Sequence, residues 1–178
     1  MAQDPELRFR PGEMPPLFGD TAATLIVDDD AVLAQVLASV LEPEGYHCTL
    51  ASSGREARAL VAERDFALAM VDVMMPGESG LELVADLLGK HDDLAVVMVT
   101  AVDEPSIAEL ALDCGAYGYI VKPFRESEML ITVANAGRRR CLEIERRTHT
   151  ERLERLLADR TAELGDALDL RAPPPPSR

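Results

Sequence analysis

Four polar residues in this sequence stand at the ends of apolar runs. Asp28, Asp72, Thr100 and Lys122 each follow a short stretch with the composition of a buried strand. The run before Asp72, residues 66–71, is apolar throughout, as in a strand covered on both faces, and turn-forming residues follow it at once. A single acid in such a place is most often a cap or a loop residue. Polar residues at the ends of four predicted strands together indicate a site built from several loops.

These residue types can bind a metal ion and a phosphoryl group. Carboxylates within about 4 Å of each other repel by roughly a few kcal/mol, so a group of acids must bind a cation or keep a proton. Oxygen ligands in a small crevice suit Mg²⁺ better than Ca²⁺, because Mg²⁺ keeps several waters and takes one or two carboxylates. Bound metal would screen Asp72 enough for it to attack a phosphoryl group. Lys122 would supply positive charge, Thr100 a hydroxyl donor, and the small Ala101 room beside them.

The elements that must position these residues alternate between strand and helix. Strands are predicted over residues 25–27, 46–51, 66–71, 94–99 and 117–121, and helices over 31–41, 54–65, 79–88 and 104–113. This alternation predicts an α/β fold, a doubly wound parallel (βα)5 sheet of about 115 residues. In the flavodoxin-like order 2-1-3-4-5, strands one and three are neighbours at the switch point. Asp28 and Asp29 would then lie beside Asp72.

Composition excludes several classes of function. Residues 21–137 carry six Lys and Arg against 20 Asp and Glu, so this part would repel a nucleic-acid backbone. The three cysteines are widely spaced and suggest neither a disulfide framework nor a zinc site. There is no apolar run of 18 residues and no N-terminal signal pattern. We therefore expect a cytoplasmic protein that binds neither membrane nor nucleic acid.

From residue 24 to about residue 136, the sequence resembles the receiver domain of two-component response regulators. Residues 25–30 resemble the family's acidic metal-binding segment, with Asp28 and Asp29 as the acidic pair. Residues 72–77 match its phosphoacceptor loop, and residues 99–101 its switch threonine. Residues 118–124 match its switch aromatic residue and its lysine. Because these matches occur in the family's order, the resemblance is specific.

The resemblance implies that Asp72 accepts a phosphoryl group from a histidine kinase or a phosphotransfer protein. Mg²⁺, for which Mn²⁺ can substitute, would be bound by Asp28, Asp29 or both, by Asp72 and by the backbone carbonyl of Met74. Such a protein is not a conventional enzyme, because its only reactions are self-phosphorylation and autodephosphorylation at one aspartate.

The resemblance also implies a switch. Thr100 and Tyr119 would couple phosphorylation to the surface formed by the fourth helix, fifth strand and fifth helix, since a new phosphoryl charge would pull Thr100 inward and Tyr119 could fill the vacated space. Lys122 precedes Pro123, which disfavours a helical backbone at the lysine, and the bond between them is a candidate for the cis form.

Beyond the domain, the sequence predicts a long helix. We expect a disordered leader at residues 1–20, the receiver domain at 21–137, a helical extension at 138–170 and a Pro-rich disordered tail at 171–178. A helix of about 40 residues is poorly stable alone, so we expect a homodimeric coiled coil. Its apolar positions are Leu142, Ile144, Leu153, Leu156, Leu157, Leu164 and Leu168. A solvated helix and one folded back on its own domain remain alternatives.

The predicted function is a response regulator that signals through dimerisation or protein contacts of this helix, without a DNA-binding output domain. One alternative is a fragment of a longer receiver-plus-output protein, and another is a receiver-like scaffold that is never phosphorylated. A haloacid dehalogenase-type phosphohydrolase would use Asp28 as nucleophile with Asp30 two residues on, but it leaves the match around Asp72 unexplained. Three arginines at 138–140, without aromatic residues among them, are weak evidence for a nucleic-acid patch.

Overall fold

The structure is a computed structural model, and it describes residues 22–101 and 105–169, without the side chains of residues 105, 159 and 162–169. Its strands are β1 (Ala23–Val27), β2 (His47–Ala51), β3 (Leu68–Asp72), β4 (Ala95–Thr100) and β5 (Gly118–Val121). Its helices are α1 (Ala31–Leu41), the 3-10 turn η1 (Glu42–Glu44), α2 (Gly54–Glu63), α3 (Gly80–Leu88), α4 (Pro105–Asp113) and α5 (Glu126–Asp169). Strands and helices alternate along the chain, as predicted.

The five strands form one parallel sheet. Their order is β2-β1-β3-β4-β5, which confirms the predicted flavodoxin-like order. β1 and β3 are paired so that Val27 lies opposite Val71, and β3 and β4 so that Asp72 lies opposite Val99. The carboxyl ends of these three central strands therefore meet at one edge of the sheet.

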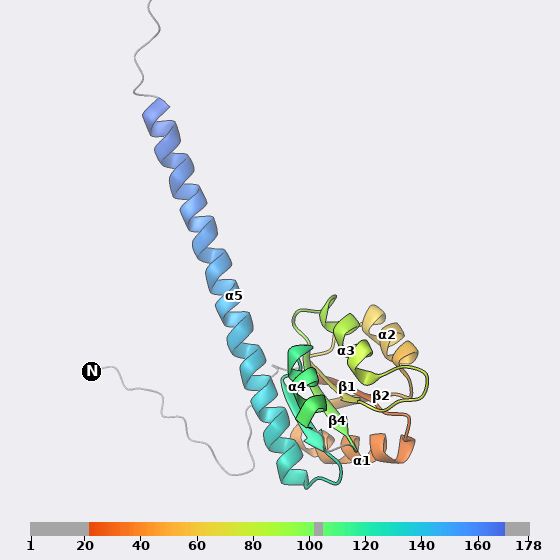
Figure 1. The fold of residues 1–178 in the computed structure, drawn as a ribbon. Helices are drawn as coiled ribbons and strands as arrows, with labels where there is room; N and C mark the ends of the chain where they lie inside the picture. Colours follow the sequence, from red (N-terminus) through yellow and green to blue (C-terminus); the bar gives the residue numbers. More distant parts are fainter. Residues whose placement is uncertain (1–21, 102–104, 170–178) are drawn as a thin grey trace, which may run out of the picture. The chain divides into compact units, whose positions relative to one another are not determined.

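Each face of the sheet has its own hydrophobic core, because successive strand side chains point to opposite faces. Ile26 and Met70 pack with Leu37 of α1 and Met129 of α5. On the other face, strand residues such as Val71 pack with α2, α3 and α4 through side chains that include Ala57, Leu83 and Ala111. Thus α1 and the first turns of α5 cover one face, and α2, α3 and α4 cover the other (Figure 1). We call these the α1–α5 core and the α2–α4 core.

Local sequence signals fix the helix ends near the site. Asp30 caps α1, because its side chain accepts hydrogen bonds from the backbone amides of Val32 and Leu33. Ser79 caps α3 in a capping box with Glu82. Both caps lie in loops that leave the carboxyl ends of strands, so they hold those loops in place.

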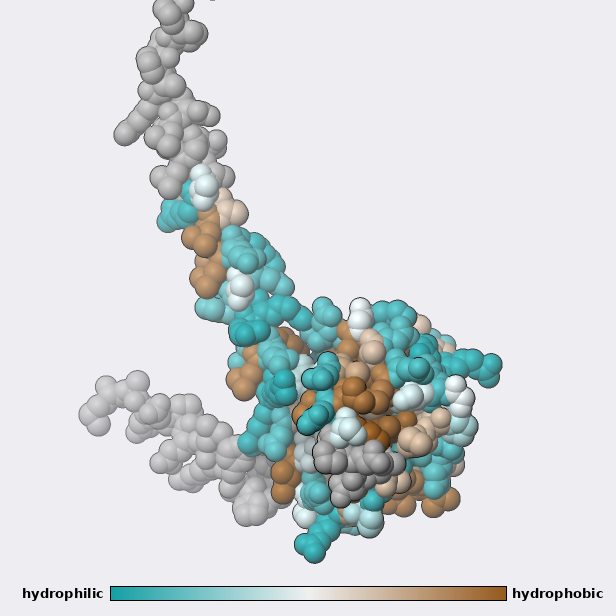
Figure 2. All heavy atoms as spheres, viewed as in Figure 1, coloured by the Kyte–Doolittle hydropathy of each residue, from teal (hydrophilic) through white to brown (hydrophobic). Residues whose placement is uncertain are grey.

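The long C-terminal helix is present. It continues from the domain without interruption, and the chain divides into two compact units between Cys141 and Leu142. In the second unit, Leu142, Leu153, Leu156 and Leu157 are 47–67% exposed. Figure 2 shows apolar patches among polar side chains along this part of the helix.

The predicted leader at 1–20 and tail at 171–178 lie outside the described residues, and the predicted boundary at residue 137 stays a prediction. In the part of the chain that the structure describes, no helix combines the length and the apolar character needed to cross a membrane.

Candidate functional site

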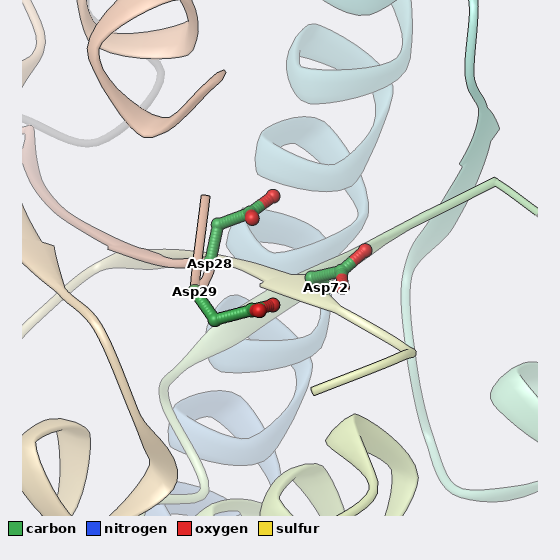
Figure 3. A group of neighbouring side chains, drawn as sticks. All are labelled: Asp28, Asp29 and Asp72. Carbon is green, nitrogen blue, oxygen red and sulfur yellow. The ribbon is translucent and has the colours of Figure 1, made fainter. Parts of the chain in front are cut away.

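Three carboxylates meet at the carboxyl ends of β1 and β3. Asp72 is the last residue of β3, and Asp28 and Asp29 directly follow β1. Asp28 is 3% exposed and Asp72 5% exposed, whereas Asp29 is exposed to solvent. One oxygen atom from each of the three lies within 4.8 Å of the others, and the carboxyl groups point to one side of the loop (Figure 3). The sheet order therefore brings together the acids that the sequence singled out.

Lys122 joins the two buried acids. Its Nζ donates a hydrogen bond of 2.8 Å to Oδ1 of Asp72 and one of 3.0 Å to Oδ2 of Asp28. The lysine follows β5, and its backbone amide donates to the carbonyl of Thr100 at 2.7 Å. The Lys122–Pro123 peptide bond is cis. The backbone hydrogen bond to Thr100 holds the lysine at its base, and its ammonium group bridges the two buried carboxylates.

Burial and charge act on the ionisation of this pair in opposite directions. Burial raises the pKa of Asp72 above its usual value, with the Asp28 charge adding to the effect, although hydrogen bonds from Lys122 and the Met74 backbone oppose it. Burial acts to lower the pKa of Lys122, but its hydrogen bonds to Asp72 and Asp28 outweigh burial and raise that pKa. The lysine is therefore positively charged at neutral pH, and the site favours a bound cation beside its acids.

The remaining predicted residues lie around the same edge of the sheet. Thr100 ends β4 and is fully buried, and Ala101 follows it at the surface. Tyr119 in β5 is half-buried and packs against the α2–α4 core. Met74 lies two residues beyond Asp72, in the loop between β3 and α3, and is 60% exposed.

Asp30 is not part of the acidic group, although the phosphohydrolase alternative requires it there. Its carboxylate caps α1, and its backbone amide donates to Oδ1 of Asp28 at 2.9 Å. Asp30 thus orients Asp28 and directs its own carboxylate to the helix.

The donor set fits a hard divalent cation. All three acidic ligands offer oxygen, which Mg²⁺, Ca²⁺ and Mn²⁺ prefer. Three ionised carboxylates and one ammonium group leave a net charge of about −2, which a divalent cation would neutralise. Asp28, Asp29 and Asp72 would therefore hold the metal, and Asp29 faces the solvent from which it would arrive.

This arrangement can be compared with known proteins. A family model described as the response regulator receiver domain matches residues 24–134. The chain belongs to the family of response regulator receiver domains. Receiver domains are signalling modules that carry a phosphoaspartate, bind metal at an acidic site and interact with histidine kinases or phosphotransfer proteins.

Relatives of this receiver domain include longer regulators. It is 39% identical over 114 residues to the uncharacterized transcriptional regulatory protein YkoG of Bacillus subtilis, with 64% of this chain and 50% of that protein covered. It is 38% identical over 119 residues to the phosphate regulon transcriptional regulatory protein PhoB of Pseudomonas aeruginosa, with coverage of 65% and 51%. The chain thus spans about half the length of these relatives.

Solved structures agree with the fold. The chemotaxis protein CheY4 of Vibrio cholerae has a TM-score of 0.61 and 30% identity, covering 65% of this chain and 98% of its own. The response regulator protein TrrA of Thermotoga maritima, solved in complex with Mg²⁺ and BeF, has a TM-score of 0.60 and 28% identity, covering 65% and 99%. The receiver domain therefore accounts for about two thirds of this chain.

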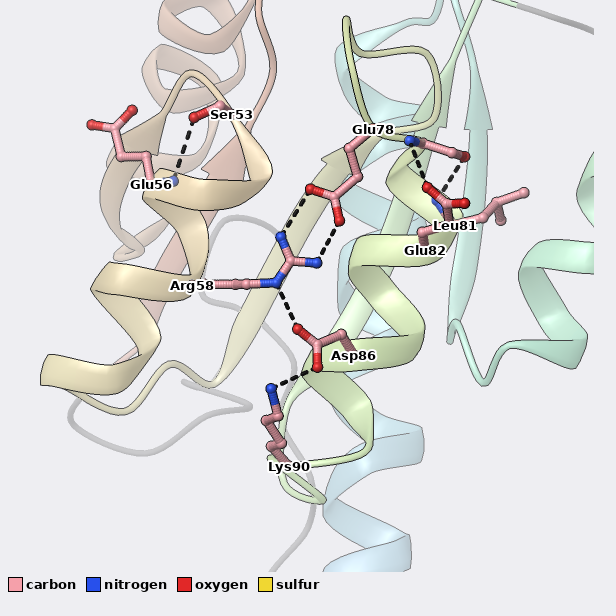
Figure 4. Close-up of polar contacts among 9 residues, drawn as sticks. Ser53, Glu56, Arg58, Glu78, Leu81, Glu82, Asp86 and Lys90 are labelled. Carbon is pink, nitrogen blue, oxygen red and sulfur yellow. Dashed lines mark hydrogen bonds and ion pairs between the residues drawn. The ribbon is translucent and has the colours of Figure 1, made fainter.

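Sequence reasoning missed one polar group next to the site. Arg58 of α2 contacts Glu78 and Asp86, and Asp86 also contacts Lys90 (Figure 4). Only the Asp86–Lys90 pair has a sequence signal, the i,i+4 spacing on a helix. The contact between Arg58 and Glu78 joins residues 20 positions apart and requires the fold to be known.

Proposed function

We propose that Asp72 accepts a phosphoryl group from the phosphohistidine of a histidine kinase or a phosphotransfer protein. Mg²⁺, or Mn²⁺ in its place, would be held by Asp28, Asp29, Asp72 and the backbone carbonyl of Met74. The observation that carries the proposal is the contact of Lys122 with Asp72 and Asp28, beside a third acid. This combination provides a nucleophile, a metal site and a cation for the transferred group.

The transfer would take place at one oxygen of Asp72. That oxygen forms a bond to phosphorus while the bond between phosphorus and the imidazole nitrogen breaks, and the electron pair returns to the imidazole. The bound metal would screen the negative charges of the acids and of the incoming phosphoryl group. Lys122 would turn from the carboxylate to an oxygen of the phosphoryl group, the Thr100 hydroxyl would donate to another oxygen, and Ala101 would leave room for both.

A change in Thr100 and Tyr119 would carry the signal to the surface of α4, β5 and α5. Phosphorylation adds about 1.5 to 2 negative charges and three acceptor oxygens, which would draw the Thr100 hydroxyl inward. Tyr119 is half-buried on the neighbouring strand β5, two positions before the residue that lies opposite Thr100, and it would move into the space that Thr100 vacates.

The helical extension would pair with a second copy of the chain in a coiled coil. Four leucines between residues 142 and 157 are about half to two thirds exposed, and an isolated helix gains little stability from its own hydrogen bonds. Burying such leucines in a dimer would stabilise the helix by about 1.5–3 kcal/mol for each side chain that is fully covered. Phosphorylation would then act on the dimer or on what the dimer presents to a partner protein.

The phosphorylation step is tested by the change Asp72→Asn. Labelling by a small phosphodonor such as acetyl phosphate, in the presence of Mg²⁺, should be lost, because the amide oxygen is a far weaker nucleophile. The matched control is Asp30→Asn, because asparagine also caps helices and Asp30 lies outside the acidic group. Wild-type labelling of the Asp72 variant would refute the proposal. If that persistent labelling came with turnover of phosphate esters, it would favour the phosphohydrolase, whose nucleophile would be Asp28.

A further inference from the structure

Arg58 joins helix α2 to the loop that leads away from Asp72. Its guanidinium contacts Glu78 with both terminal nitrogens, one of them at 2.8 Å, and its Nε donates to Oδ2 of Asp86 in α3 at 2.6 Å (Figure 4). A planar guanidinium that binds one carboxylate with two nitrogens fixes the orientation as well as the distance of that carboxylate. Glu78 is therefore held in one place relative to α2.

Gly54, the first residue of α2, leaves the space in which Glu78 lies. A Cβ atom at this position would be 2.3 Å from Oε2 of Glu78 and 3.2 Å from an Arg58 nitrogen. The carboxylate thus lies against the start of the helix, where the helix dipole favours negative charge. The hydrogen bonds from Arg58 also lower the pKa of Glu78, so the ionised form is the one held.

The loop that carries Glu78 also carries the proposed metal-binding carbonyl of Met74. At its base the backbone is fixed, because the Val73 amide donates to the Val99 carbonyl at 2.9 Å and the Gly80 amide donates to the Val73 carbonyl at 3.0 Å. Within the loop, Met74 pairs with Ser79 in an isolated antiparallel bridge. A shift of Glu78 would therefore reach Met74 through its neighbour Ser79.

We propose that Arg58 is a positioning residue for the metal site: by binding Glu78, it sets the place of the loop from Met74 to Ser79, and with it the Met74 carbonyl. The inference rests on the proposed function, because it takes Met74 as a metal ligand. Arg58 touches neither the metal nor the phosphoryl group. Its contact with Asp86 joins α2 to α3 and does not involve the loop, so the two partners of one guanidinium have different roles.

Three variants separate these roles. Glu78→Gln weakens the hold of Arg58 on the loop, and Gly54→Ala displaces the Glu78 carboxylate without removing a charge. Asp86→Asn is the matched control, because it weakens the other contact of the same guanidinium. Two quantities are measured in the full chain: the Mg²⁺ dissociation constant, from an NMR titration of the loop amides with MgCl₂, and the hydrogen exchange of the same amides without metal.

We expect Glu78→Gln and Gly54→Ala to raise the Mg²⁺ dissociation constant about 3- to 10-fold, less than the roughly 10- to 100-fold typical of groups bonded directly to a metal ligand. Both should speed exchange of the amides of residues 74–79, and Asp86→Asn should change neither quantity. Unchanged affinity and exchange in the first two variants, or equal effects of all three, would overturn the inference. If the wild type binds no Mg²⁺, the proposed function fails, and the exchange data still decide whether Arg58 holds the loop.

Discussion

Replacing Lys122 by methionine should destabilise the metal-free protein by about 3–5 kcal/mol at pH 7. Its ammonium group lies 2.8 Å from one buried carboxylate and 3.0 Å from another. At an effective dielectric constant near 20, each contact is worth roughly 5–6 kcal/mol of attraction before the cost of desolvating the lysine is subtracted. Removing the lysine leaves the carboxylates of Asp28 and Asp72 buried without a counter-charge, and the loss of one partner from a buried ion pair typically costs about 3–5 kcal/mol. Methionine preserves most of the length of the side chain, so lost packing contributes little.

The loss should depend on pH. The pKa of Asp72 is already raised by burial, and the Lys122→Met change raises it further. For a carboxyl group whose folded pKa exceeds its unfolded value, the penalty is absent below the unfolded pKa of about 3.9, grows as the pH rises towards the folded pKa and is complete above it. The wild-type lysine has a raised pKa, so its stabilising effect is fully present below about pH 10.4 and is lost above the folded pKa. The loss of stability should therefore be larger at pH 7 than at pH 4.

Mg²⁺ should reverse much of the loss. A ligand that binds only the folded state adds about 2.7 kcal/mol at 100 times its dissociation constant. Without the ammonium group, the two buried carboxylates are available to the metal, so the Lys122 variant should bind Mg²⁺ more tightly than the wild type. The assay is urea unfolding followed by circular dichroism at pH 4 and pH 7, with and without Mg²⁺.

The control is Lys90→Met, which removes an exposed lysine paired with Asp86. Surface pairs contribute about 0–1 kcal/mol, so this variant should resemble the wild type at both pH values. An equal loss in the Lys122 variant at pH 4 and pH 7, or no recovery with Mg²⁺, would refute the electrostatic reasoning.

Three further outcomes are expected. Asp72→Asn should raise the free energy of unfolding of the metal-free protein at pH 7, because it removes a buried carboxylate whose pKa is raised by burial, and the gain should vanish below about pH 3.9 in the same urea assay. Gly80→Ala should cost more than about 2 kcal/mol in thermal or urea unfolding, since a Cβ would lie 1.9 Å from the Asp72 carbonyl oxygen. Truncation after Gly137, or Leu153→Glu combined with Leu157→Glu, should give a monomer in light scattering, and an unchanged dimer would move the interface to the receiver domain.

Much of the fold could be predicted because the central strands are buried on both faces. Uniformly apolar runs such as Leu68–Val71 have few other structures open to them, and the intervening helices fix the parallel direction. The strand ends then brought Asp28, Asp72 and Lys122 together without any knowledge of side-chain geometry. The predicted start of β3 at residue 66 was wrong by two residues, because Phe66 and Ala67 are buried but precede the strand.

Exposed polar contacts could not be predicted in the same way. Arg58 and Glu78 lie on separate elements, and neither residue type nor its spacing in the sequence indicates the contact.

The run of arginines at 138–140 shows a related limit of prediction from sequence. Arg139 lies over the ring of Tyr117 at 5.2 Å, and Arg140 donates from Nε to the carbonyl of Asp93. Two of these three arginines therefore contact their own domain, so their charge alone said little about a nucleic-acid partner.

The division of the interior by the sheet constrains how a signal can travel. Tyr119 packs in the α2–α4 core, whereas α5, which continues into the extension, packs in the α1–α5 core through Met129 and Val133. The two cores are separated by β-strands, and a change that starts at Tyr119 begins on the side away from α5. Ile120, the next residue of β5, is buried in the α1–α5 core. A single edge strand thus has neighbouring side chains in both cores, so under the proposed function the backbone of β5 would link a change at Tyr119 to the core in which α5 packs.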